Sequence, residues 1–340
     1  MGGLRVLRLR ETSVVAKISA PLTVYGTIGR ALSLARVVFC LSFFLTLLSC
    51  NSTRPVVKIG LLAPFEGLHR ESGYEALSAM RMALADYPLE HFDALPLALD
   101  TSADPAQARR AAAKMLRDET VVAVIGPLQA RQVSAVAEVI TASDLAWQPP
   151  ARPASSEAAQ TLIVTTISEM SGTNIAVAGL DFGWPQNSAA QWSSKTGKSV
   201  TLVNSPTDAA AADALLWLGG PAEGAAFLGD LRTQSPAVPF WTTAVAGDPV
   251  FLSLLLERLD GTPPGPIYWV IALGGSAEQY TNWSAEHADA PPTAFAVYLA
   301  TRRALQKFAG DDPPSNKREL ALFSLDLEGK SELMEILPLP

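Results

Sequence analysis

Cysteine and histidine are scarce in this sequence of 340 residues. It contains 2 cysteines, Cys40 and Cys50, and 3 histidines, His69, His91 and His287. No pair of these residues has the close spacing that zinc sites use, such as two histidines separated by three residues. We therefore expect no metal site and no cofactor, and we interpret the histidines as solvated or capping residues.

Charged residues are also few, at 17% of the chain, and they are unevenly distributed. Residues 1–49 contain six basic residues and one acidic residue, a net charge of +5. Because the whole chain has a formal net charge of -7, the part from Cys50 onward has a net charge of -12. A protein that binds duplex nucleic acid needs clustered Lys and Arg to neutralise phosphates. The acidic body therefore argues against nucleic acid as a partner, and the basic leader is typical of an exported protein.

The common catalytic motifs are missing. The chain contains no G-x-G-x-x-G, G-x-x-x-x-G-K-[ST], G-x-S-x-G or H-E-x-x-H pattern, and these are signatures of nucleotide-binding, serine-hydrolase and zinc-protease sites. The glycine pairs Gly219-Gly220 and Gly274-Gly275 are typical of turns. We expect a protein that is not an enzyme.

The apolar run at residues 37–48 is too short to cross a membrane. Its VVFCLSFFLTLL sequence falls short of a hydrocarbon core about 30 Å thick when it is built as a helix. It fits the hydrophobic region of a signal peptide, with Arg30 and Arg36 as the basic flank. Residues 1–29 are then a long n-region, unless translation starts further downstream.

The leader ends in Leu-Leu-Ser-Cys, which resembles the lipobox of bacterial lipoproteins. The resemblance implies that Cys50 receives a diacylglycerol and becomes the mature N-terminus. We predict a signal peptide at 1–49, a lipidated tether at 50–55, and an extracytoplasmic protein anchored in the membrane, in the periplasm or at the cell surface. The alternatives are an uncleaved anchor helix and a chance apolar stretch.

From Val56 onward, short β-rich runs alternate with helical patterns, and this alternation is typical of βαβ units around a parallel sheet. With 49% hydrophobic residues, the chain has enough apolar material for two domains of about 150 residues each. We expect strands at 56–62, 95–99, 121–125, 145–148, 161–167, 174–178, 199–204, 214–218, 240–245, 267–273, 321–327 and 333–337. We expect helices at 74–87, 104–116, 132–142, 187–194, 222–232, 249–259 and 292–308.

The second of these helices has the clearest start signal. Asp104 is a typical N-cap, Pro105 occupies the first helical position, and Gln107 stands where a capping box places its reciprocal acceptor. The sequence therefore predicts a capped helix beginning at this point.

Two segments carry a resemblance to a known family. The runs VVKIGLLAPFEG and DTSADPAQARRAAAKMLRDETVVAVIGPLQA are similar to the N-terminal lobe of type I periplasmic binding proteins, in the group that binds leucine, isoleucine and valine for ABC importers. Weaker similarity follows in ADALLWLGGPAEGAAFLGDLR and PPTAFAVYLATRRALQKFAG. The good match extends from Val56 to about Pro150.

The resemblance implies an α/β fold of two hinged lobes, each a mainly parallel sheet flanked by helices. We predict lobe 1 at 56–167 and 274–318, and lobe 2 at 168–273 and 319–340. It also implies a monomer that closes on a small-molecule ligand and passes it to an ABC transporter permease. Because open parallel sheets bind ligands beyond the carboxyl ends of their strands, we expect the site in the loops that follow strands.

The family's site residues do not transfer directly. Where amino-acid receptors of this group place serine and threonine after the third strand, this chain has Gln129, Ala130, Arg131 and Gln132. A second loop reads Ala151-Arg152, and the acidic residue that would pair with a substrate ammonium corresponds to about Ala244. An ammonium buried without a charge partner is costly, so these departures weigh against a branched-chain amino acid.

The remaining polar candidates and the candidate aromatic walls are loop residues that can also be solvent-facing or structural. Arg131 together with Arg152 would suit an anionic ligand. The polar candidates are Glu66, Gln129, Arg131, Arg152 and Thr243, with Ala130 beside them, and the aromatic walls are Phe65, Trp184 and Trp241.

Only residues 168–173 separate the extended run 161–167 from the next strand, where the family usually inserts a helix. We therefore expect a second lobe that lacks one covering helix, as in a divergent member of the family. The function most consistent with these patterns is capture of a small polar solute, amino-acid-like or anionic, for an ABC importer. The alternative is a lipoprotein that uses the same fold as a sensor or as a scaffold for an envelope enzyme.

Overall fold

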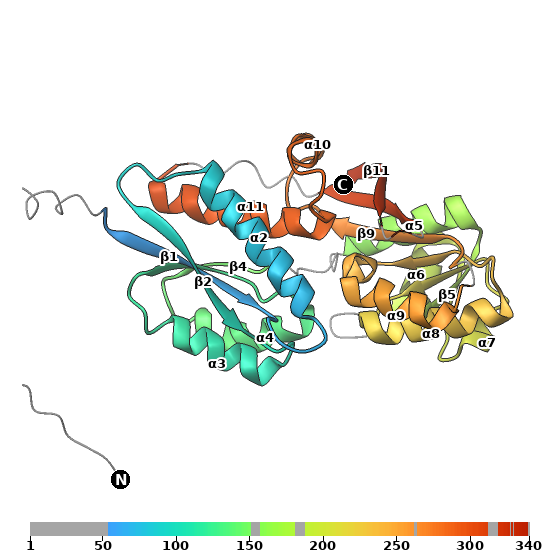
Figure 1. Cartoon of the computed structure of the whole chain (residues 1–340). Coiled ribbons are helices and arrows are strands. Elements are labelled where there is room, and N and C mark those ends of the chain that lie inside the picture. Colours follow the sequence, from blue (N-terminus) through green and yellow to red (C-terminus); the bar gives the residue numbers. More distant parts are fainter. Residues whose placement is uncertain are drawn as a thin grey trace, which may run out of the picture. The chain divides into compact units, whose positions relative to one another are not determined.

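Residues 54–150, 157–180, 188–261, 264–311, 319–326, 328 and 330–338 are described by the computed structural model. The predicted leader, with its apolar run 37–48 and Cys50, lies outside these residues. None of the helices in the described part combines the length and the apolar character that crossing a membrane requires. All the helices and strands below lie in one compact unit, Pro55–Pro340 (Figure 1).

The first sheet has four parallel strands in the order β2-β1-β3-β4. The strands are β1 Val56–Ala63, β2 Asp93–Asp100, β3 Val121–Ile125 and β4 Ala146–Gln148. The central strands β1 and β3 are almost entirely buried, as expected for a parallel sheet that is covered by helices on both faces.

Helices cover both faces of this sheet. On one face, α3 (Pro105–Met115) and α4 (Ala130–Ile140) pack apolar side chains against β1 and β3. On the other face lies α2 (Arg70–Asp86), against which α11 (Pro292–Ala309) packs (Figure 1). A helix from late in the chain therefore completes the first lobe.

The second sheet has seven strands in the order β11-β10-β9-β8-β7-β5-β6. The strands from β9 to β6 are parallel, and β10 and β11 add an antiparallel edge. Their bounds are β5 Asn174–Ala178, β6 Ser199–Leu202, β7 Ala214–Trp217, β8 Phe240–Thr242, β9 Ile267–Ala272, β10 Glu319–Leu325 and β11 Ser331–Pro338.

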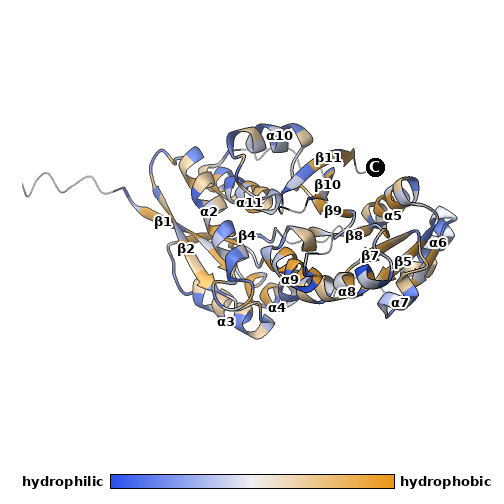
Figure 2. Cartoon of the chain, turned by 45° about the vertical axis from the view of Figure 1, so that its right-hand side comes forward, coloured by the Kyte–Doolittle hydropathy of each residue, from blue (hydrophilic) through white to orange (hydrophobic). Residues whose placement is uncertain are grey.

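The second sheet is also covered on two faces. Alternate residues of β7 face opposite ways: Leu215 belongs to the cluster with α8 (Pro221–Gln234) and α9 (Pro249–Leu259), and Leu216 belongs to the other cluster. All four residues of β7 are buried, and Figure 2 colours it and β5 as apolar. A short helix α7 (Pro206–Ala209) contacts α8.

The other face of the second sheet is covered by a helix that the sequence analysis did not expect. Residues 161–167, predicted as an extended run, belong to α5 (Glu157–Ser171), which packs with α6 (Ser188–Thr196) against β5 and β7. The strand prediction was wrong because β-branched residues in this run share the 3- and 4-residue spacing of a buried helical face: Ile163, Val164 and Ile167 are all buried.

Two further expectations fail with it. The second lobe does not lack its covering helix, because α5 occupies that place. The predicted lobe boundary after residue 167 also lies one helix too late, since α5 packs on the second sheet. The chain passes between the sheets three times, between β4 and α5, after β9, and before β10.

The start signal of α3 is confirmed in part. The Asp104 carboxylate accepts a hydrogen bond from the backbone N–H of Gln107 at 2.7 Å, so Asp104 is the N-cap. The capping box does not form, because Gln107 Oε1 accepts from the Arg110 guanidinium and the backbone N–H of Asp104 donates to the carbonyl of Thr101. A true capping box begins α10 (Ala277–Glu286), between Ser276 and Gln279, in a helix that was not predicted.

Candidate functional site

A cavity of about 390 Å³ lies where the carboxyl ends of strands from both sheets meet. Its volume is within the range of about 300–1,000 Å³ that is usual for small-molecule sites. Helices α2 and α11 complete its wall. The lining segments that follow strands are Pro64 after β1, Leu128–Arg131 after β3, Pro150 after β4, Leu218–Glu223 after β7 and Thr243–Asp248 after β8.

The first turns of α2 place three polar residues on the cavity wall. His69 is the N-cap residue of this helix, and Ser72 and Glu75 follow at intervals of three, which keeps all of them on one side. The His69 side chain makes no capping hydrogen bond to the backbone of α2, so its ring is available for contacts across the cavity.

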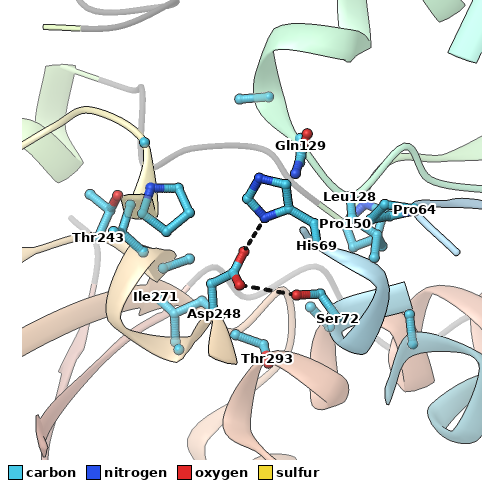
Figure 3. Close-up of a pocket in the computed structure, with 18 of the residues that line it drawn as sticks. Pro64, His69, Ser72, Leu128, Gln129, Pro150, Thr243, Asp248, Ile271 and Thr293 are labelled. Carbon is cyan, nitrogen blue, oxygen red and sulfur yellow. Dashed lines mark hydrogen bonds and ion pairs between the residues drawn. The ribbon is translucent and has the colours of Figure 1, made fainter. Parts of the chain in front are cut away.

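Asp248 meets two of these residues from the second lobe. Its Oδ2 lies 3.3 Å from His69 Nδ1, and its Oδ1 accepts a hydrogen bond of 3.2 Å from the Ser72 hydroxyl (Figure 3). The same Oδ1 accepts the backbone N–H of Val250 at 3.0 Å, which makes Asp248 the N-cap of α9. One carboxylate therefore caps a helix of one lobe and joins it to a helix of the other.

This bridge is largely shielded from solvent. The side chains of His69 and Asp248 are 12% and 17% exposed. Hydrogen bonds strengthen when water is excluded, so the contact holds the two walls of the cavity together in this state of the molecule.

Glu75 is the most electrostatically perturbed group on the wall. Burial, followed by the nearby carboxylates Glu71 and Asp248, raises the pKa of Glu75 to about 7. Desolvation disfavours the charged form of a carboxyl group and like charges add to the effect. Glu75 therefore changes its charge near neutral pH.

Four of the predicted site residues lie on this cavity. Gln129, Ala130 and Arg131 line it at the start of α4, and Thr243 lines it after β8. Loops that follow strands thus supply these residues, as the parallel topology predicts.

Phe65 and Glu66 lie elsewhere. They are not part of the lining, and their backbone N–H groups donate to Asp100 Oδ1 at 2.7 and 3.3 Å, which fixes the turn after β1. The Phe65 ring packs edge-on against Tyr74 with its centroid 5.6 Å away. The prediction that these two residues face the ligand site is wrong for this structure.

Trp241 is not a wall of the cavity either. It is 1% exposed and belongs to the core under α5, where its indole N–H donates to the Ser171 hydroxyl at 3.0 Å. Since the side chains of a strand alternate between faces, the one that follows Phe240 points away from α9. Arg152 and Trp184 lie outside the described residues.

A carboxylate does lie near the position that the family's acidic residue would occupy. Ala244 lines the cavity at the place assigned to the acidic residue, but the 3-10 helix Ala244–Gly247 carries the chain on to Asp248, which lies on the same wall. An available signal was the pair Asp248-Pro249, which repeats the Asp104-Pro105 cap pattern. Nothing comparable in the sequence marks His69, Ser72 or Glu75, because α2 was recognised only by its apolar stripe.

The polar groups of the described residues do not form a metal centre. No group of three or more His, Cys, Asp and Glu side chains in that part of the chain is arranged to hold an ion. The cavity presents carboxylates, hydroxyls, an amide, the Arg131 guanidinium and the His69 imidazole between apolar walls, and a few polar groups on apolar walls are typical of small-molecule sites.

Comparison with known proteins agrees with this arrangement. No protein-family model and no curated protein matches the sequence. Among solved structures, the leucine binding protein LivK from Thermotoga maritima is similar with a TM-score of 0.65 and 14% identity, covering 83% of this chain and 99% of that one. LivJ from Streptococcus pneumoniae, in complex with isoleucine, has a TM-score of 0.62 and 12% identity, covering 83% and 99%.

A third similar structure is a solute-binding protein of an ABC transporter from R. palustris, in complex with 4-hydroxybenzoate. Its TM-score is 0.64 and its identity 16%, and the alignment covers 84% of this chain and 98% of that chain. The S. pneumoniae and R. palustris proteins are solute-binding proteins of transporters. The chain therefore has the two-lobed α/β fold of the type I periplasmic binding proteins.

Proposed function

We propose that this protein is an extracytoplasmic solute-binding protein that captures a small polar solute between its lobes and delivers it to an ABC transporter permease. It performs no chemistry, and ligand binding shifts the lobes toward a closed state. The observation that carries the proposal is the cavity, which both sheets line with the ends of their parallel strands.

The residues on the two walls support roles in binding. Gln129 and Arg131 come from the first lobe, and Thr243 and Asp248 come from the second. A solute that contacts both pairs would favour the closed arrangement, because only that arrangement offers all four contacts at once.

Membrane attachment is the second part of the proposal. The lipobox-like ending of the leader supports a diacylglycerol on Cys50, and such an anchor would keep the binding protein beside its permease. Acyl chains contribute about 0.8 kcal/mol for each buried CH₂ group, so two or more chains anchor a protein stably.

A thermal unfolding screen of the purified protein tests the binding function. The probes include leucine, isoleucine, acetamide and 4-hydroxybenzoate, since isoleucine and 4-hydroxybenzoate occupy similar structures. A solute present at a hundredfold excess over its Kd stabilises the folded state by about 2.7 kcal/mol, which corresponds to a rise in Tm of roughly 5 °C for a protein of this size.

The sensor or scaffold alternative makes the opposite prediction. A scaffold that does not bind a solute would show no rise in Tm with any member of a wide panel of amino acids, amides, carboxylates and amines. That result would remove the transport function and leave the protein-binding one.

A further inference from the structure

The charged side chains on the cavity wall are mostly acidic. Glu75, Glu223 and Asp248 reach the wall, whereas Arg131 is the guanidinium among the described lining residues, and His69 is the other titratable side chain. A wall with an excess of negative charge attracts ligands of positive charge and repels anions.

Asp248 already has its partners, but Glu75 has none. The Asp248 carboxylate accepts from the Val250 N–H and the Ser72 hydroxyl, and its Oδ2 lies 3.3 Å from His69 Nδ1. The Glu75 side chain is half-buried and makes no hydrogen bond or ion pair with any residue that the structure describes. A half-buried carboxylate without a partner has lost part of its hydration, and a ligand that brings a positive charge to it would recover that free energy.

A second acceptor on the same wall also lacks a donor. Gln129 lines the cavity, and its Oε1 is buried without a hydrogen-bond partner among the described residues. Rotation of the amide can turn this oxygen toward a donor. Acceptors that are left unpaired favour a ligand rich in N–H or O–H donors.

The surroundings restrict the kind of cation. The donor groups of the described residues are not arranged for a metal ion. None of the described lining residues is Phe, Tyr or Trp, so they provide no aromatic cage of the type that binds quaternary ammonium groups. Aliphatic side chains make up much of the remaining wall, among them Leu128, Leu218, Val245 and Ile271. This combination fits an ammonium group with N–H donors on a short apolar body.

We propose that the solute is a small organic cation, a primary or secondary amine in its protonated form, and that Glu75 is the charge partner of its ammonium group. This inference rests on the proposed solute-binding function and names the class of solute. A cationic solute differs from the anionic ligand that Arg131 and Arg152 suggest in the sequence.

Four-carbon probes that differ in their end groups, and therefore in net charge, test the inference on the intact protein. Putrescine, n-butylamine, γ-aminobutyrate and succinate are titrated by calorimetry at about pH 8, where Glu75 is ionised, and tetramethylammonium serves as the cation without N–H donors. We expect at least one of the two amines to bind about tenfold or more tightly than the zwitterion, the dianion and tetramethylammonium.

Glu75→Gln should weaken amine binding by about tenfold or more, because it removes the charge and keeps the shape. Glu257→Gln is the matched control, since Glu257 is exposed on α9 and does not line the cavity. It should bind the amines as the parent does. Far-ultraviolet circular dichroism checks that both variants are folded.

The inference and the function fail in different ways. If γ-aminobutyrate, succinate or a panel solute without net positive charge binds more tightly than both amines, the solute-binding function stands and the cation inference is overturned. Amine binding that is unchanged in Glu75→Gln overturns the role of Glu75. If no probe and no solute of the wider panel binds, the proposed function itself fails.

Discussion

Glu75 links the cavity to pH. Its pKa of about 7 in the folded protein, against an ordinary value of 4.5, means that the folded state holds a proton that the unfolded state has released between these two values. The free energy of unfolding therefore falls as the pH rises from about 4.5 to 7 and then levels off. The groups that face Glu75 are Glu71 on its own helix and Asp248 from the second lobe, with His69 next to Asp248.

Glu75→Gln should remove this loss of stability. We expect the variant to match the parent near pH 4.5 and to exceed it by about 1–2 kcal/mol near pH 8, after allowance for solvent screening at a partly open wall. Urea unfolding of both proteins and of Glu257→Gln at the two pH values measures the difference. If the parent and Glu75→Gln have the same free energy of unfolding at the higher pH, the ionised form of Glu75 does not destabilise the folded protein, and this account of Glu75 is contradicted.

At the scale of single residues, the sequence predicts which loops line the cavity better than it predicts which helical side chains do. Gln129, Arg131 and Thr243 could be found because they follow strands, and parallel strands end together. Glu75 and Ser72 could not, because they are two polar residues in the amphipathic helix α2, and polar residues on a helix are normally solvated. Only the position of the second lobe makes that face of α2 a wall.

Among the secondary-structure elements, helix α9 has a start that serves both the fold and the cavity. Asp248 caps it and also contacts His69 and Ser72. Asp248→Ala should lower the free energy of unfolding by about 1–2 kcal/mol, since an N-cap is lost. Asp248→Asn should recover most of that loss, because an amide oxygen can still accept the N–H of Val250.

The N-cap of α3, Asp104, serves as a control that separates the capping role of Asp248 from its contacts with His69 and Ser72. Asp104→Ala and Asp104→Asn change the N-cap of α3, which is not part of the cavity wall, so they report the cap alone. Chemical denaturation of the four variants gives the comparison. If Asp248→Ala is no less stable than the parent, the carboxylate does not hold the helix and the second lobe in the way described.

Elements with strong local signals could be predicted, and those without them could not. The Asp-Pro cap of α3 and the apolar run of β3 gave bounds close to the observed ones. In α5 the β-branched residues favour a strand locally, but packing against the second sheet decides for a helix. Helix α10 could not be predicted from periodicity because its buried face is narrow and consists of Tyr280 and Trp283. The capping box at Ser276 and Gln279 is the local signal that marks its start.

For the whole molecule, the proposed lipidation of Cys50 predicts where the protein is found in the cell. If Cys50 is lipidated, the protein should be found in the membrane fraction, and Cys50→Ala should move it to the soluble fraction. Cys40→Ala is the matched control, because Cys40 lies inside the apolar run 37–48 and should not change the distribution. Fractionation followed by immunoblotting measures this. A Cys50→Ala variant that stays in the membrane fraction would instead indicate an uncleaved anchor helix.

The most direct test of the central claim, that a small solute binds in the cavity between the lobes, is calorimetric titration of a variant whose cavity is filled. Ala244 is exposed and lines the cavity, whereas Ala211 is exposed and does not, so Ala244→Trp is compared with Ala211→Trp. The titrant is the panel solute that raises the Tm of the parent most. We predict that Ala244→Trp binds it about tenfold or more weakly, with Ala211→Trp unchanged. Unaltered affinity in Ala244→Trp would show that the solute binds elsewhere.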